Sequence, residues 1–174
     1  MAGREDLFNE SMRLGHSAAW DLQWNRAIEF YRKALAEFPN HANALNSLGL
    51  ALLETGQLDE ALLVYKTASQ ASPEDPIPVE KCAEIYERLG KIKESIQARE
   101  DSADMYIRRK DAGKAVDNWR HIARLDPRNL ASRTRLALTY ERLGRTRDST
   151  LEYLSVASIL ASGGKIDRAK EAVP

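Results

Sequence analysis

The first half of the chain repeats with a period of 34 residues. A shift of 34 positions aligns Leu14 with Leu48 and also aligns other small and apolar residues with one another. Within each copy, apolar residues recur three and four positions apart, which predicts amphipathic helices, and a proline ends the copy because it lacks the N–H that a helix needs. Such a period builds a protein from stacked units that each share a core with their neighbours. The aligned pairs are Leu14 and Leu48, Gly15 and Gly49, Ala27 and Ala61, Tyr31 and Tyr65, Ala34 and Ala68, and Pro39 and Pro73.

A second, 54-residue period begins further along the chain. The sequence YERLG stands at 86–90 and again at 140–144, and the segment 91–110 between the copies contains neither proline nor glycine. This segment predicts one long helix, which ends one helical hairpin and begins the next, so that the added helix lengthens the period from 34 to 54. The same displacement predicts a second long helix at about 147–162.

The combined pattern of Leu-Gly, Tyr, Ala and Pro resembles the tetratricopeptide repeat, a helix-turn-helix unit of about 34 residues. The resemblance implies an all-α fold, a right-handed superhelix of stacked antiparallel helix hairpins. We expect a single domain over 1–174, with repeats at about 8–41 and 42–75, a three-helix unit at 76–129 and a unit at 130–174 that is cut short. The first repeat departs from the pattern at its inter-helix turn, where Leu22 stands in place of the usual glycine.

Composition places the chain among folded proteins, with 43% hydrophobic and 30% charged residues. It has no apolar stretch long enough to cross a membrane, no signal-peptide pattern at its start and a single cysteine, Cys82, which favours a cytoplasmic location. The range 1–75 carries 6 basic and 11 acidic groups, whereas the range 128–174 carries 9 and 5. The net charge of zero argues against a uniformly basic nucleic-acid binder.

No pattern of catalytic or metal-ligating residues is evident. No two of the three histidines stand at metal-ligand spacing. Most carboxylates have a basic residue three or four positions away, which is typical of a solvated helix face. We therefore predict a protein that is not an enzyme and has no catalytic, metal or cofactor site.

In the family that the chain resembles, the first helices of successive repeats line a groove that holds peptides. The resemblance predicts a neutral start to this groove, whose asparagines can bond a peptide backbone, and an acidic end that favours a partner with a basic segment. The equally weighted alternative is an acidic face neutralised by Lys81, Arg88 and Lys91. Trp20 is added as an exposed aromatic contact. The predicted groove residues are Asn9, Met12, His16, Trp20, Asn43, Asn46, Leu50, Leu53, Glu80, Glu84, Glu87, Glu100 and Asp104.

These observations favour a scaffold that binds a protein or peptide, and two other interpretations stay open. One is a self-association module, a homo-oligomer formed through a stacking face that the truncated last unit leaves uncovered. The other is RNA binding through the segment 120–147, which holds eight arginines against only Asp126 and Glu141. Nucleic acid is the less favoured partner, because the segment 8–75 matches a 34-residue repeat rather than the 35-residue RNA-binding type.

Overall fold

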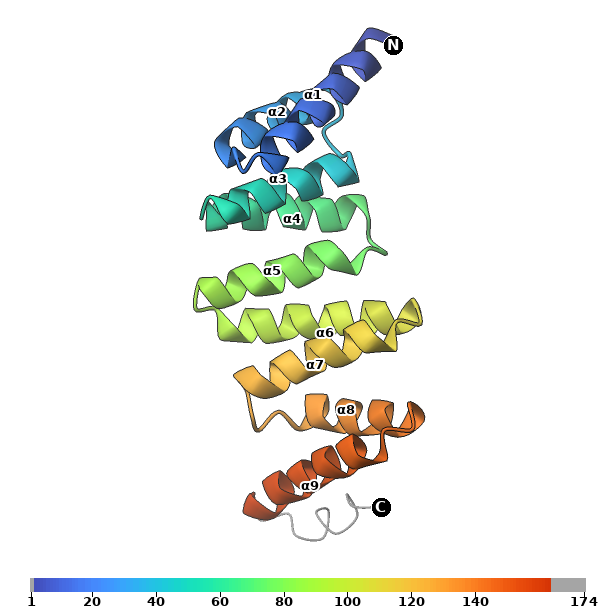
Figure 1. Ribbon diagram of the computed structural model, residues 1–174. Coiled ribbons are helices and arrows are strands. Elements are labelled where there is room, and N and C mark those ends of the chain that lie inside the picture. The colour runs from blue at the N-terminus through green and yellow to red at the C-terminus, as the bar shows by residue number, and fades with distance from the viewer. Residues whose placement is uncertain (1, 164–174) are drawn as a thin grey trace. The chain divides into compact units, whose positions relative to one another are not determined.

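A computed structural model describes residues 2–163, with side chains from residue 3. Within this range the backbone forms helices and no strand, as Figure 1 shows, and the predicted all-α class is confirmed. The helices are α1 (Ala2–Trp20), α2 (Trp24–Glu37), α3 (Ala42–Glu54), α4 (Leu58–Ala71), α5 (Pro76–Arg88), α6 (Ile92–Arg108), α7 (Ala112–Leu125), α8 (Leu130–Arg142) and α9 (Thr146–Ser162).

The chain divides into two compact units, unit 1 over Met1–Ser95 and unit 2 over Ile96–Pro174. In unit 1 each helix from α1 to α5 packs against the next. Polar contacts also join alternate helices: the ring of His16 on α1 meets Ser47 on α3 at 3.5 Å, and Arg32 on α2 pairs with Glu60 on α4 at 2.6 Å. The first helices of the hairpins therefore neighbour one another, and so do the second helices.

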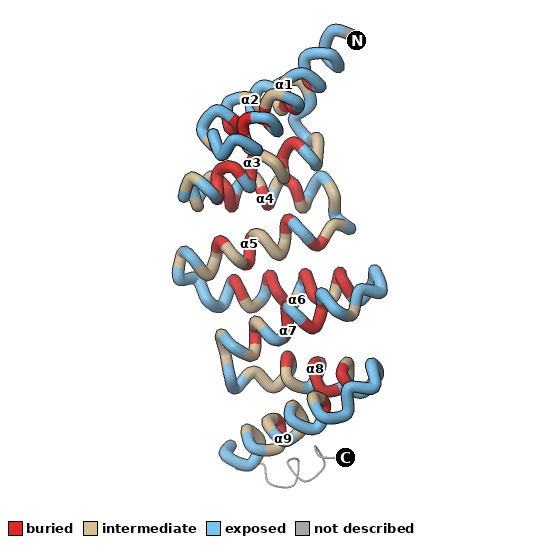
Figure 2. Tube along the Cα trace, in the orientation of Figure 1, coloured by how far each residue is buried: buried red, intermediate tan, exposed pale blue. Residues whose placement is uncertain are grey.

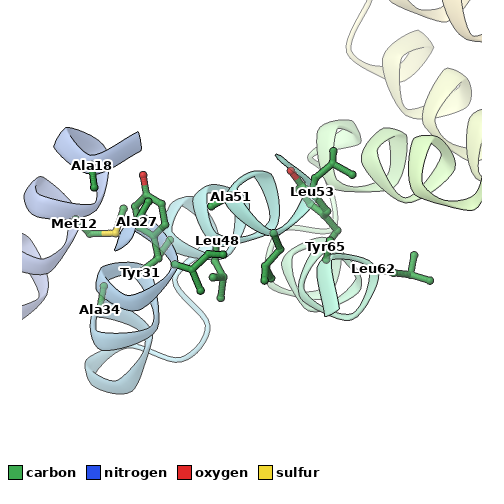
Figure 3. Packing of buried hydrophobic residues seen from close by; sticks show 14 of the residues in the cluster. Met12, Ala18, Ala27, Tyr31, Ala34, Leu48, Ala51, Leu53, Leu62 and Tyr65 are labelled. Carbon is green, nitrogen blue, oxygen red and sulfur yellow. The ribbon is translucent and has the colours of Figure 1, made fainter. Parts of the chain in front are cut away.

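Small residues let the helices of unit 1 approach closely. A Cβ added to Gly15 would lie 2.5 Å from Cε1 of Tyr31, and one added to Gly49 would lie 2.8 Å from Cε2 of Tyr65. Both distances are shorter than carbon atoms tolerate without displacement, so each glycine makes room for a tyrosine ring. Figure 3 shows both rings inside the buried cluster.

Two kinds of turn connect the helices. The first kind is tight and holds one residue in the left-handed region, because the backbone must reverse within a few residues; these residues are Leu22, Gly56, Gly90, Lys110 and Gly144, with φ between 57° and 75°. The second kind contains proline or leads into it, after α2, α4 and α7. Asp75 ends one such turn and caps α5, whose first residue is Pro76, because proline suits the first turn of a helix.

The long helices predicted from the 54-residue period are present, since α6 and α9 each contain 17 residues. The turns alternate between tight and proline-containing along the chain except at α6, which a tight turn precedes at Gly90 and a second tight turn follows at Lys110. Thus α6 begins as the second helix of one hairpin and ends as the first helix of another. Figure 2 shows buried residues along the middle of α6, and they lie between Ser95 and Tyr106, with Ser102 among them.

Unit 2 has a core of its own around Trp119, which α7 contributes. Tyr106 on α6 and Tyr140 on α8 belong to the same buried cluster, and α8 packs against both α7 and α9. Trp119 is therefore a packing residue of this unit. No helix in the described range is both long and apolar enough to cross a membrane. The predicted truncated end of the last unit, over 164–174, lies outside the described residues.

Candidate peptide-binding site

The first helices of unit 1 present polar and apolar side chains on their open side. Asn9 and His16 on α1 are exposed, and so are Asn43 and Leu50 on α3. The contact between His16 and Ser47 joins the two helices at this surface. Amide side chains both donate and accept hydrogen bonds, so this face can bond the backbone of an extended peptide while Leu50 offers an apolar contact.

The structure corrects the predicted groove at two positions. Met12 is only 9% exposed and Leu53 only 2%, and both belong to the hydrophobic core of unit 1. In Figure 3, Met12 lies beside Ala27 of α2 and Leu53 lies toward Tyr65 of α4. The helices turn these two side chains inward, so the prediction that they line an accessible groove is wrong.

Of two other predicted groove residues, Trp20 is exposed and Asn46 is half-buried. Trp20 is 88% exposed at the last residue of α1, which is unusual for the largest side chain because burial of apolar area stabilises a fold. Asn46 on α3 is half-buried, and its Oδ1 atom is buried without a hydrogen-bond partner. A buried carbonyl oxygen usually receives a hydrogen bond, so the amide of Asn46 has bonding capacity that the described residues do not satisfy.

The acidic residues on α5 are engaged within unit 1. Glu84 binds Lys81 at 2.9 Å and Arg88 at 2.8 Å. Partial burial raises the pKa of Glu84, but hydrogen bonds and charge attraction from these two cations outweigh that effect and hold its pKa below the ordinary value. Glu87 accepts a hydrogen bond from Ser95 at 3.0 Å, and Glu80 is half-buried. The neutralised-face alternative therefore describes Glu84 correctly.

The last two predicted groove residues, Glu100 and Asp104, belong to the part of α6 that lies in unit 2. Glu100 is half-buried. Asp104 accepts a hydrogen bond from Arg135 of α8 at 2.9 Å, and the same guanidinium lies 5.8 Å from the ring centre of Trp119. The charge of Asp104 is thus satisfied by its own chain.

The arginine-rich segment also forms specific internal contacts. Carboxylates bind several of its arginines: Arg133 pairs with Glu152 at 2.8 Å, Arg135 with Asp104 at 2.9 Å and Arg145 with Asp148 at 2.7 Å. The structure adds a cavity between α7, α8 and α9 that the sequence did not predict. The 54-residue period gave a signal for it only indirectly, because it implies that the second helices α7 and α9 are neighbours in the stack. Across the described part of the chain, no group of histidine, cysteine, aspartate and glutamate side chains could hold a metal ion.

Comparison with known proteins agrees with this architecture. Residues 12–76 match the family described as tetratricopeptide repeat. A structure titled "Crystal structure of MamA protein" superimposes with a TM-score of 0.55 at 16% identity, covering 92% of this chain and 96% of that one. A chain of the CopN-Scc3 complex gives 0.57 at 20% identity and covers 66% and 67%. At these identities the structural likeness concerns the fold alone.

Curated relatives match this chain over only part of their length. Photosystem I assembly protein Ycf3 of Synechococcus sp. (strain CC9605) is 29% identical over 118 residues, which are 66% of this chain and 65% of that protein. Human tetratricopeptide repeat protein 8 is 29% identical over 113 residues, which are 64% of this chain but 21% of that protein. The chain thus matches slightly less than two thirds of the length of the Ycf3 protein.

Fold, turn geometry and glycine-tyrosine packing together define a protein built from repeated helical hairpins, the architecture of an interaction scaffold. Residues 12–76 match the tetratricopeptide repeat family, and the helices of the described range have the fold of solved proteins built from such repeats.

Proposed function

We propose that unit 1 is a scaffold that binds an extended peptide segment of a partner protein across α1 and α3. The observation that carries this proposal is the open side of the two first helices, where Asn9, Asn43 and Leu50 are exposed beside the linked pair His16 and Ser47. The oxygen of Asn46, which has no hydrogen-bond partner, supports it further, because a side-chain amide can accept a hydrogen bond from a peptide N–H.

Because the acidic side chains of α5 already have partners within the chain, we expect a partner segment that needs no basic residues. Glu84 already has two cationic neighbours on its own helix, and Glu87 accepts from Ser95. A basic ligand would have to displace these contacts, and exposed ion pairs contribute little net free energy. Main-chain hydrogen bonds and the contact with Leu50 therefore contribute most of the affinity in this proposal.

Several relatives are named as assembly proteins, for photosystem I in each of the Ycf3 cases. This supports a role in which the chain holds a segment of one subunit while a complex forms. The match covers 65% of those proteins, so the assembly role belongs to the proposal for this chain. The proposed partner is an extended segment that offers main-chain hydrogen bonds and an apolar side chain to α1 and α3.

The test is selection of short peptides from a random library on the immobilised chain, followed by titration of one selected peptide against purified variants. Asn43→Ala combined with Asn46→Ala should weaken binding about tenfold, since each lost hydrogen bond to a peptide group contributes about 0.5–1.5 kcal/mol. A matched control is Asn25→Ala combined with Gln70→Ala, because both residues are exposed amides on the second helices α2 and α4. Equal losses in the two double variants, or none in either, would show that the peptide does not use the α1–α3 face.

A further inference from the structure

Unit 2 contains a second surface, which the proposed function does not use. A cavity of about 500 Å³ lies between α7, α8 and α9, and Arg120, His121 and Arg124 of α7 line it together with Arg133 of α8 and Glu152 of α9. A volume of this size is in the range of about 300–1,000 Å³ that binding pockets occupy. The remaining charged lining residue is Asp117 of α7.

The charges of the cavity leave a cationic surplus on α7. Arg133 and Glu152 neutralise each other at 2.8 Å, and their side chains are only 18% and 20% exposed. Arg120 and Arg124 then line the cavity with a single further carboxylate, that of Asp117, which leaves a surplus of one positive charge. A nitrogen of Arg124 donates to Nδ1 of His121 at 2.6 Å, which orients this guanidinium on the wall of the cavity.

An apolar hollow of about 400 Å³ adjoins the cavity, and Arg133 lines both. Leu151, Leu154 and Ile159 of α9 line the hollow with Pro127, and Leu151 and Leu154 are 55% and 50% exposed. Arg133 also donates to the carbonyl oxygen of Pro127 at 2.8 Å. Its guanidinium therefore has two partners and forms a fixed boundary between a cationic half and an apolar half.

We propose that this composite surface binds an acidic amphipathic peptide segment of a partner protein. Carboxylates of the segment pair with Arg120 and Arg124, since guanidinium binds carboxylate through two parallel hydrogen bonds. Aliphatic side chains one helical turn away on the same segment enter the hollow beside Leu151 and Leu154. The surface belongs to unit 2, so this binding does not depend on the α1–α3 face of unit 1.

The composition of the surface favours a peptide over RNA. RNA binding needs successive cationic side chains for successive phosphates and aromatic rings on which unpaired bases stack. Here Glu152 and Asp117 interrupt the cationic lining, and apart from Arg133 the hollow is lined by aliphatic residues, a proline and serines, without an aromatic ring. A peptide segment that carries both carboxylates and aliphatic side chains matches the cationic cavity and the apolar hollow together.

The test uses the full chain and a fluorescein-labelled peptide of about four helical turns, in which pairs of glutamates and pairs of leucines alternate along one face. Fluorescence anisotropy at about 0.15 M salt, where distant charges are screened, should show saturable binding. Two comparison peptides replace all glutamates by glutamine or all leucines by serine. Each replacement should weaken binding about tenfold or more, because each removes one half of the match.

Variants of the chain locate the site. Arg120→Ala combined with Arg124→Ala should weaken binding of the glutamate–leucine peptide at least about tenfold. The control is Arg142→Ala combined with Arg147→Ala, which removes the same charge from exposed positions that line neither the cavity nor the hollow. This control should change the binding by less than about twofold. Leu154→Ser supplies an independent variant, because its half-exposed side chain can be replaced without loss of the fold. It should weaken the peptide with leucines and leave the weak binding of the serine version unchanged.

Three kinds of result would overturn the proposal. One is failure of the expected peptide binding, seen either as no saturable binding of the glutamate–leucine peptide or as equal losses in the two arginine double variants. A second is an oligouridine of similar length that binds more tightly and loses its binding in the Arg120 and Arg124 variant, which would assign the surface to RNA. A third is a dimer in sedimentation velocity that the same variant abolishes, which would assign the surface to a second copy of the chain. Asn43→Ala with Asn46→Ala should leave all these measurements unchanged, so failure here is distinct from failure at the α1–α3 face.

Discussion

Gly15 and Gly49 each lie against the ring of a buried tyrosine, so we predict that alanine at either position destabilises unit 1. The added Cβ would stand 2.5 Å from the ring of Tyr31 or 2.8 Å from that of Tyr65, and a buried ring cannot move aside freely. Gly15→Ala and Gly49→Ala should each lower the free energy of unfolding by about 1–3 kcal/mol, the usual cost of overpacking. Urea denaturation followed by circular dichroism measures the change.

The control for this prediction is Gly113→Ala in α7. A Cβ there meets only a side-chain oxygen of Asp111 at 3.5 Å, an ordinary contact. Alanine should then stabilise the helix by about 0.5–1 kcal/mol, because glycine loses more backbone entropy on folding. If Gly15→Ala and Gly49→Ala behaved like Gly113→Ala, the glycine-tyrosine contact would not restrict the helix crossing.

A second residue-scale prediction concerns Leu22, which has φ of 57° in the turn between α1 and α2. Left-handed backbone costs a residue with a Cβ about 1–2 kcal/mol, and the side chain of Leu22 is 71% exposed, so it recovers little by burial. Leu22→Gly should raise the free energy of unfolding by about 0.5–1 kcal/mol after the greater entropy of glycine in the unfolded chain is subtracted.

The reciprocal variant is Gly56→Leu, in the matching turn between α3 and α4. Gly56 has φ of 75°, and an added Cβ would meet nothing within 4 Å. Only the backbone conformation opposes the change, so thermal denaturation should show a loss of about 1–2 kcal/mol. A stabilising Gly56→Leu, or a destabilising Leu22→Gly, would mean that the exposed leucine makes a contact that outweighs the backbone strain.

At the scale of the element, α6 is the helix that distinguishes this chain from a regular 34-residue array. Ser102 is fully buried near its centre. Ser102→Pro should lower the free energy of unfolding by about 3 kcal/mol or more, because proline removes an internal hydrogen bond and clashes with the preceding turn. Ser102→Ala separates the side chain from the backbone and should cost about 1 kcal/mol. Hydrogen exchange of the amides of α6, measured on both variants, should show fast exchange in the proline variant alone.

At the scale of the whole molecule, tyrosines in both cores predict a loss of stability at alkaline pH. Burial raises the pKa of Tyr31, Tyr65 and Tyr140 above the ordinary value, although a hydrogen bond from Ser47 partly offsets the shift at Tyr31 and arginines partly offset it at Tyr140. Burial also raises the pKa of the Cys82 thiol to about 11. These four groups stay protonated in the folded state at pH values where the unfolded chain has already released its protons.

The sign follows from this difference in protonation. A group whose folded pKa exceeds its unfolded pKa contributes stability in full below the unfolded pKa, and the contribution is lost as pH rises through the folded pKa. The loss should begin near pH 9 for Cys82 and near pH 10 for the tyrosines, with a slope of up to about 1.4 kcal/mol per pH unit for each group. Denaturation midpoints measured from about pH 8 to 11 test it, and Tyr65→Phe should flatten the slope above pH 10. A midpoint that stays constant through this range would mean that the cores admit hydroxide or solvent without unfolding.

The sequence by itself determined the class of fold, the positions of the helices and the long helix α6. It could do so because these features depend on local spacing: the period of small and apolar residues, the prolines after the second helices, and the absence of proline and glycine between 91 and 110. The same repeat aligns Gly15 with Gly49 and Tyr31 with Tyr65, and the structure shows that each glycine lies against the tyrosine of its own unit.

Only the tertiary structure decided which side chains remain available at the surface. Met12 and Leu53 stand at groove positions of the repeat but turn into the core, and Glu84 lies between Lys81 and Arg88. The cavity of unit 2 likewise depends on how α7, α8 and α9 pack, since Arg120 and Glu152 belong to different helices and line one cavity only through that packing. Exposure and charge pairing are properties of neighbours brought together from different helices, and the spacing within one helix does not specify them.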